Sequence, residues 1–144
     1  MVRDGRRVRR LVADGGTFVR SLRHSHRKRD DAGQVTCGEV LSIRRCGARG
    51  RLRLVFEGGP GRIVPDGYPV PSGVVGTAPD RTLNLHEPGT VRAFLDVALR
   101  RGWDPDGPVP RELDGWSLFD EAHTLRTGAC QAPCPAGRVR CGRS

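Results

Sequence analysis

The chain lacks any apolar run that approaches the ~20 residues of a membrane-crossing helix. It is also poor in aromatic side chains, with four Phe, two Trp and one Tyr among 144 residues. The first absence argues against a membrane span. The second limits the chain to a modest hydrophobic core and leaves few rings on which nucleic-acid bases can stack. Together they favour one small domain with no membrane partner.

The start of the chain has paired arginines but lacks the apolar region of an export signal. Arg6-Arg7 and Arg9-Arg10 suggest a twin-arginine leader, yet the apolar residues 11–13 are followed at once by Asp14-Gly15-Gly16. The five cysteines are an odd number, which fits reduced thiols better than a disulfide framework. We therefore expect a cytoplasmic protein.

Common signatures of nucleotide and hydrolase sites are missing too. Residues 58–62 are rich in glycine but do not match the GxxxxGK[ST] phosphate loop, and neither Ser72 nor Ser117 lies in a GxSxG elbow. The acidic residues of the C-terminal third fall in expected turns, where water solvates them. We assign no catalytic residue and no cofactor, and we expect a protein that is not an enzyme.

Lysine is almost absent, since Lys28 is the only one among 25 basic residues. The net charge of +9 comes from the two ends of the chain: residues 1–29 hold ten basic and two acidic residues, and residues 127–144 hold three basic ones. Such a surface attracts polyanions and acidic proteins. The candidate binding residues are the arginines of the first segment: Arg6, Arg7, Arg9, Arg10, Arg20, Arg23, Arg27 and Arg29.

The regular structure begins with two expected hairpins. Residues 8–13 and 17–27 are compatible with strands around a glycine turn, as are residues 40–46 and 51–56. Leu52, Leu54 and Phe56 alternate with the residues between them, which is typical of a strand with one buried face.

A strand that leads directly into a helix is expected at residues 81–103. Leucines alternate with polar residues over 82–86, and Pro88 then suits a first helical turn. Gly102 supplies the left-handed residue that ends a helix. The residues that recur at helical spacing are Val91, Phe94, Leu95, Ala98 and Leu99. We expect this apolar face, above all Leu95, Ala98 and Leu99, to pack on the strands.

The same block carries a sequence motif. It consists of Leu83-Asn84-Leu85-His86-Glu87-Pro88, Val91-Arg92, Ala98-Leu99, Gly102-Trp103 and Pro105. The motif resembles the C-terminal strand and helix of small uncharacterised bacterial α+β proteins. That resemblance implies a meander of strands packed by one helix, and a setting among accessory or immunity-like proteins, but it implies no activity.

Together these elements predict an α+β fold with an antiparallel sheet of about four or five strands, packed by one main helix. The domain is expected to span residues 1–126. Residues 58–79 contain five prolines and predict a long Pro/Gly-rich loop, whereas the apolar residues within 113–119 are expected to return onto the core. Residues 127–144 contain little that is apolar and predict a flexible tail with cysteines.

Two groups of residues are candidate metal ligands. His24 and His26 lie two apart on an expected strand and would project from the same face. Nothing in the sequence brings a further ligand near them, although the residues that would complete a site are Asp30, Asp31, His86 or Cys37. The alternative interpretation, which we prefer, is a polar strand end. Cys37 itself, like Cys46, is expected to be a small buried side chain.

The second group lies in the tail: Cys130, Cys134 and Cys141, with His123 as a fourth ligand. Their spacing matches no established zinc pattern, so we interpret these cysteines as incidental.

The junction between the expected strand and helix is a candidate anion site. His86 and Glu87 precede the helix there, where free backbone N–H groups can bind an anion. The preferred alternative is that the polar groups of Asn84 and His86 hold the turn.

The expected function is protein binding, of the accessory or immunity type that the resemblance implies, through the proline-rich loop and the exposed face of the sheet. The alternative is a nucleic-acid-associated module in which the N-terminal arginines neutralise phosphates. With so few aromatic residues, we expect nucleic-acid binding to be weak and indifferent to sequence.

Overall fold

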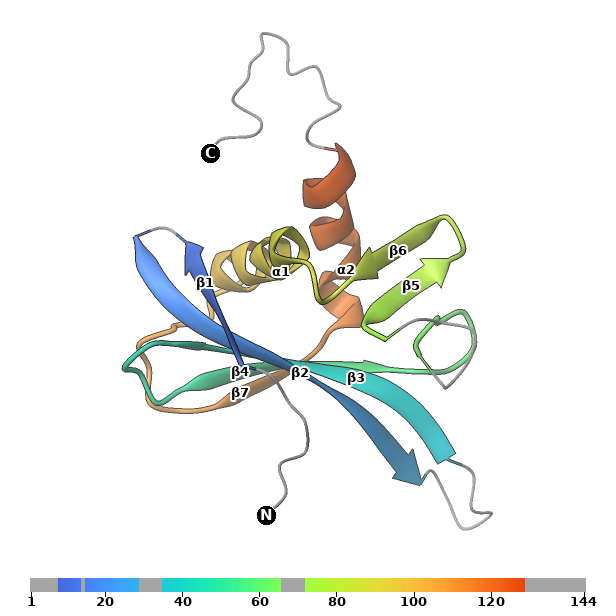
Figure 1. Cartoon of the computed structure of the whole chain (residues 1–144), viewed down its shortest axis with the longest axis horizontal. Helices are drawn as coiled ribbons and strands as arrows, with labels where there is room; N and C mark the ends of the chain where they lie inside the picture. Colours follow the sequence, from blue (N-terminus) through green and yellow to red (C-terminus); the bar gives the residue numbers. More distant parts are fainter. Residues whose placement is uncertain (1–7, 14, 29–34, 66–71, 129–144) are drawn as a thin grey trace, which may run out of the picture.

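A computed structural model of the chain describes residues 8–13, 15–28, 35–65 and 72–128 (Figure 1). The fold belongs to the α+β class, as predicted. Its elements in chain order are β1 (Arg9–Ala13), β2 (Gly16–Lys28), β3 (Val35–Arg45), β4 (Arg51–Glu57), β5 (Val74–Ala78), β6 (Arg81–Asn84), α1 (Pro88–Arg100), β7 (Arg111–Asp114), α2 (Trp116–His123) and a π-helical turn (Thr124–Gly128).

Five strands form the main sheet, in the order β1-β2-β3-β4-β7, and β5 and β6 form a separate two-stranded sheet. Both predicted hairpins are present, with β1 antiparallel to β2 and β3 antiparallel to β4. Gly15 has a φ of 77°, a left-handed conformation that glycine adopts without strain in the first turn. The last strand, β7, runs parallel to β4, so the sheet is mixed rather than wholly antiparallel.

The expected loop at residues 58–79 contains a strand, and to that extent the loop prediction was wrong. No proline lies between residues 72 and 78, so β5 can pair with β6 there, and Val75 is fully buried. Gly76 also exchanges backbone hydrogen bonds with Ile63 at 2.7 and 3.0 Å. Residues 66–71 of this segment lie outside the described residues.

The molecule has two layers (Figure 1). The helices and the β5–β6 hairpin cover one face of the main sheet, and no described element covers the other. The core lies between the layers. Its most completely buried side chains, each with no exposed surface, are Ile43, Leu52, Leu54, Phe56, Val75, Leu85, Val91, Phe94, Leu95, Val97, Ala98 and Ala122.

Helix α1 begins at Pro88 and is followed by Gly102 at φ 101°, as the sequence predicts. The Trp103 amide donates a hydrogen bond to the Ala98 carbonyl at 3.0 Å, which closes the last turn in the manner of a Schellman cap. The predicted apolar face is confirmed: Leu95 and Ala98 are fully buried, and Leu99 packs half-buried at the edge of the core.

The segment after α1 returns to the core as predicted, but it does so as a strand and a second helix. Gly115 lies between β7 and α2, where a Cβ atom would stand 2.4 Å from the Phe56 ring. This close approach lets Trp116 pack on Phe56, with ring centroids 5.3 Å apart, and donate its indole N–H to the Glu57 carbonyl at 2.9 Å. Leu118 and Phe119 are then almost completely buried.

The burial of α1 predicts the effect of one substitution. Leu95→Ala removes a fully buried side chain and should lower the free energy of unfolding by about 2–5 kcal/mol, whereas Leu99→Ala, at a half-buried position on the same helix, should lower it less. Urea denaturation followed by circular dichroism measures both. Equal losses at the two positions would contradict the assigned helix face.

Candidate functional site

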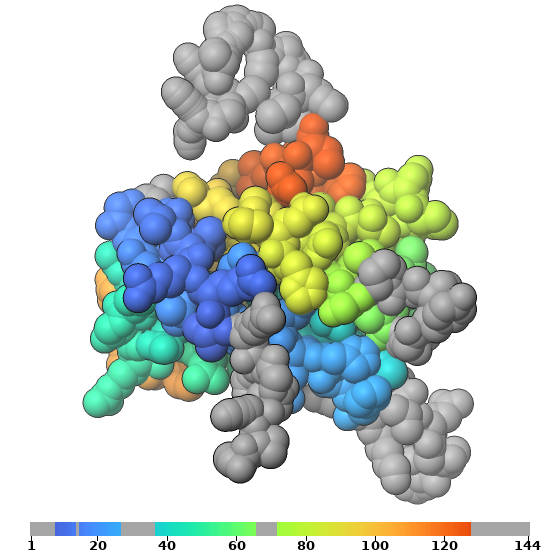
Figure 2. Space-filling model, in the orientation of Figure 1, coloured from blue at the N-terminus to red at the C-terminus, as the bar shows by residue number. Residues whose placement is uncertain are grey.

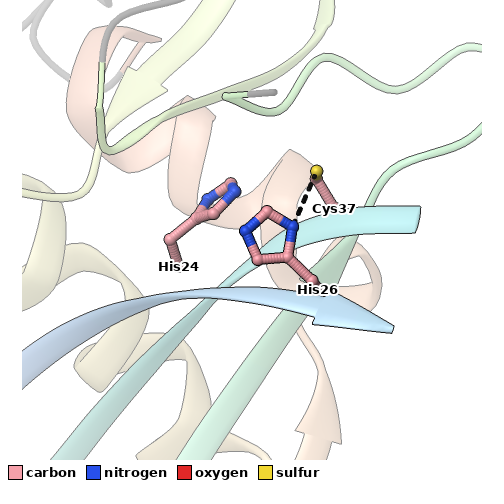
Figure 3. A group of neighbouring side chains, drawn as sticks. All are labelled: His24, His26 and Cys37. Carbon is pink, nitrogen blue, oxygen red and sulfur yellow. Dashed lines mark hydrogen bonds between the residues drawn. The ribbon is translucent and has the colours of Figure 1, made fainter. Parts of the chain in front are cut away.

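The pairing of β2 with β3 brings four chemically reactive side chains to one face of the sheet. His24 lies opposite Glu39 and His26 lies opposite Cys37. In an antiparallel pair, opposite residues project from the same face, and so do residues two apart on one strand. Figure 3 shows the result for three of them, with both imidazoles on β2 and the thiol on β3 pointing to the same side.

The donor atoms of His24, His26 and Cys37 all lie within 4.8 Å of one another. The Nδ1 atom of His26 is 3.4 Å from the Cys37 sulfur, and the two imidazole rings meet edge to face with centroids 4.7 Å apart. Asp30, Asp31, His86 and Cys37 were the residues predicted to complete a site with the two histidines. Among the described residues, Cys37 is the one that lies beside them. Asp30 and Asp31 lie outside the described residues.

Glu39, which sequence reasoning missed, forms a hydrogen bond with His24 of this cluster. Its Oε2 atom is 2.6 Å from Nδ1 of His24, and its side chain is only 2% exposed, against 34% for His24. Burial raises the pKa of the Glu39 carboxyl above its usual 4.5, and the hydrogen bond and charge of His24 oppose that rise. The hydrogen bond between the carboxyl and Nδ1 thus restrains the orientation of the His24 ring.

A second site lies on the same face, nearer the start of β2, around the buried side chain of Arg20. One of its terminal N–H groups donates to the His86 carbonyl at 3.2 Å, and its Nε atom is buried without a hydrogen-bond partner. Burial lowers the pKa of the Arg20 guanidinium, and the charge of Arg9 lowers it further. Arg20 is one of the predicted binding residues, and it is buried rather than outward-facing because it lies on the same face of β2 as Phe18 and Leu22.

A cavity of about 300 Å³ opens beside Arg20. In Figure 2 the blue surface of β1 and β2 borders the yellow-green surface of the segment that leads into α1; these parts of the chain, with β3, line the cavity. The described lining contains no acidic residue. It consists of Arg9, Arg20, Ser21, Leu22, Leu41, Ser72, Leu85 and His86. The site is therefore a basic pocket with a partly apolar wall.

His86 has a structural part in this pocket. Its backbone N–H donates to the side-chain oxygen of Asn84 at 2.9 Å, so Asn84 holds the turn as predicted, and its Nε2 atom lies 3.1 Å from the Ser72 hydroxyl. At the start of α1, Glu87 forms an ion pair with Arg126, whose guanidinium lies 2.7 Å from the Glu87 carboxylate. The basic pocket is therefore distinct from the helix start.

The other candidate residues are dispersed. Arg10 and Arg23 are exposed, and their register places them on the sheet face opposite to the pocket. Cys46 is exposed in a turn after β3, so its expected burial was wrong. The candidates Arg6, Arg7, Arg29, Cys130, Cys134 and Cys141 lie outside the described residues, and so does the side chain of Arg27.

Comparison of the chain with protein-family models, with curated proteins and with solved structures found no match. None of the helices that the structure describes is both long and apolar enough to cross a bilayer.

The two described cysteines should differ in reactivity. Cys46 is exposed and Cys37 is half-buried beside His26, so iodoacetamide should modify Cys46 first in metal-free buffer. Peptide mapping by mass spectrometry separates these two sites from the three tail cysteines. Faster modification of Cys37 would contradict the burial assigned to it.

Proposed function

We propose that this chain is a protein-binding module that takes a carboxylate of its partner into the basic pocket beside Arg20. The observation that carries the proposal is the Arg20 guanidinium, which has a buried Nε–H without a partner and belongs to a residue that lines a cavity whose described lining holds no acidic side chain. A buried donor left unpaired costs about 1–3 kcal/mol, so an acceptor that enters the pocket gains that free energy.

A carboxylate is the acceptor that this pocket fits best. The guanidinium presents its donors as a planar fork that matches the two carboxylate oxygens, and Arg9 adds a second positive charge at the exposed rim. The Ser72 hydroxyl and the His86 ring supply further polar contacts. The bound group would be an acidic side chain or a C-terminal carboxylate of a protein.

The apolar wall favours a protein over a nucleic acid. Leu22, Leu41 and Leu85 line the cavity and can contact the methylene groups of an acidic side chain or an apolar neighbour. A phosphodiester backbone has no comparable apolar part, and the described lining contains no Phe, Tyr or Trp on which a base could stack. The immunity-type role that the sequence motif implies would be one form of this binding.

A row of arginines on the uncovered face of the sheet favours the alternative function, nucleic-acid binding. On the uncovered face of the sheet, Arg44 lies directly opposite Arg51, and Arg10 follows across Val19 in the same row. Like charges directly opposite each other are unfavourable, and a polyanion would relieve that repulsion. The two proposals use opposite faces of the sheet, so adjacent residues of β1 distinguish them.

The test uses Arg9 and Arg10, which are neighbours, are both exposed and project from opposite faces. The probe is the acetylated dipeptide Leu-Glu, titrated into ¹⁵N-labelled full-length protein. We expect its binding to shift the Arg20 Nε–H resonance. Arg9→Ala should weaken the affinity by about tenfold, in line with loss of a charged hydrogen bond, whereas Arg10→Ala should leave it unchanged.

A parallel titration uses a short DNA duplex at physiological salt. Weak binding that disappears as salt increases is expected of any basic surface. Sub-micromolar DNA binding that Arg10→Ala abolishes and Arg9→Ala does not would replace the protein-binding proposal. Equal effects of the two substitutions on dipeptide binding, or an unshifted Arg20 resonance, would also overturn it.

A further inference from the structure

We infer that His24, His26 and Cys37 form a binding site for a zinc-class divalent metal ion, with Glu39 as the residue that positions His24. The three ligand residues come from two adjacent strands and lie on one face, where the register of β2 and β3 alone determines their spacing. The site is separate from the basic pocket, since Leu22 lies between Arg20 and His24 on this face of β2.

The distances fit a site that closes on the ion by rotation of side chains. Around tetrahedral zinc, with Zn–N near 2.0–2.1 Å and Zn–S near 2.3 Å, ligand atoms stand about 3.3–3.6 Å apart. The His26 nitrogen and the Cys37 sulfur already meet this spacing at 3.4 Å, and the widest separation in the cluster is 4.8 Å. A contraction of about 1.2–1.5 Å, within the reach of side-chain rotation, would bring the widest pair to the zinc spacing.

Glu39 prepares His24 to act as a ligand. Its carboxyl group lies 2.6 Å from Nδ1. In the tautomer in which Nδ1 carries the proton and donates it to Glu39, Nε2 has a free lone pair for a metal ion. A carboxylate that orients a metal-binding histidine is a recurring arrangement in zinc sites.

The donor set selects the class of ion. Two imidazoles and one thiolate favour zinc and its neighbours over magnesium or calcium, which prefer oxygen ligands. Three protein ligands leave a fourth tetrahedral position for water. The cluster lies where the cover over this sheet face ends, because Phe18 is buried, Leu22 is half-buried and His24 and His26 are exposed. An ion and its water can therefore reach the site from solvent.

The experiment uses the metal-free full-length protein and two ions, Zn²⁺ and Co²⁺. We expect one equivalent of Zn²⁺ to bind with a dissociation constant below about 1 µM. Co²⁺ should produce the charge-transfer absorption of a cobalt–thiolate bond. Bound Zn²⁺ should also slow the alkylation of Cys37 and leave that of Cys46 unchanged, so the second cysteine serves as an internal control.

Matched variants locate the metal. Cys37→Ser should abolish the cobalt–thiolate band and His26→Ala should weaken Zn²⁺ binding, whereas Cys46→Ser and the triple replacement of Cys130, Cys134 and Cys141 by Ser should change neither. Glu39→Gln should weaken binding by about tenfold and retain the thiolate band, because it alters a positioning residue and no ligand. Circular dichroism confirms that each variant is folded.

Three outcomes would overturn the inference. The first is the absence of Zn²⁺ binding below about 10 µM, which is too weak for a dedicated site. The second is a cobalt–thiolate band that survives in Cys37→Ser and is lost in the triple tail variant, since the metal would then lie in the tail. The third is equal protection of Cys37 and Cys46 by Zn²⁺.

Discussion

The antiparallel pairing of β2 with β3 is the constraint on which the rest of the structure depends. It joins 11 residue pairs, from Phe18 with Arg45 to Lys28 with Val35. Because the side-chain period of a strand is two, a slip of one residue would place Leu41 and Ile43 on the opposite face from Arg20, so these three residues could no longer lie on one face. The same slip would separate His26 from Cys37. The register that buries the core therefore also assembles both candidate sites.

Two of the three residues in the histidine and cysteine cluster, His24 and His26, could be placed together from the sequence. The spacing of His24 and His26 indicates a shared face, but the partner strand was expected to begin only at residue 40, after a glycine that is unfavourable in strands. In the structure Gly38 lies so close to β4 that a Cβ atom would stand 2.5 Å from the Phe56 carbonyl oxygen. The glycine is thus a requirement of close strand packing, which local sequence does not reveal, and β3 continues through it and Cys37 back to Val35.

The helix α1 and the two hairpins were predictable because each has a local periodic signal and a turn residue suited to its conformation. Strand β7 has four residues and pairs with β4, about 60 positions earlier, so no local pattern marks it. Strand β5 was missed for a different reason: its partner β6 follows after only two residues, but the prolines of residues 58–79 favour a loop there. For β7, therefore, the sequence left long-range pairing open.

The two proposed sites share a physical origin in buried charge. Arg20 and Glu39 project from the same face of the β2–β3 pair, are both almost buried and have opposite charges, yet the pair Leu22 and Leu41 lies between them. Four residues along the strands separate their positions by about 13 Å, so they do not neutralise each other directly.

Burying an ionised group is costly unless a counter-charge satisfies it. Glu39 has His24 as its partner, and a metal ion on His24 would add positive charge beside it. Arg20 has a backbone carbonyl and an unpaired Nε–H. The two ligands that we propose would each add a counter-charge beside one of these buried groups: a cation next to the His24–Glu39 pair and an anion next to Arg20.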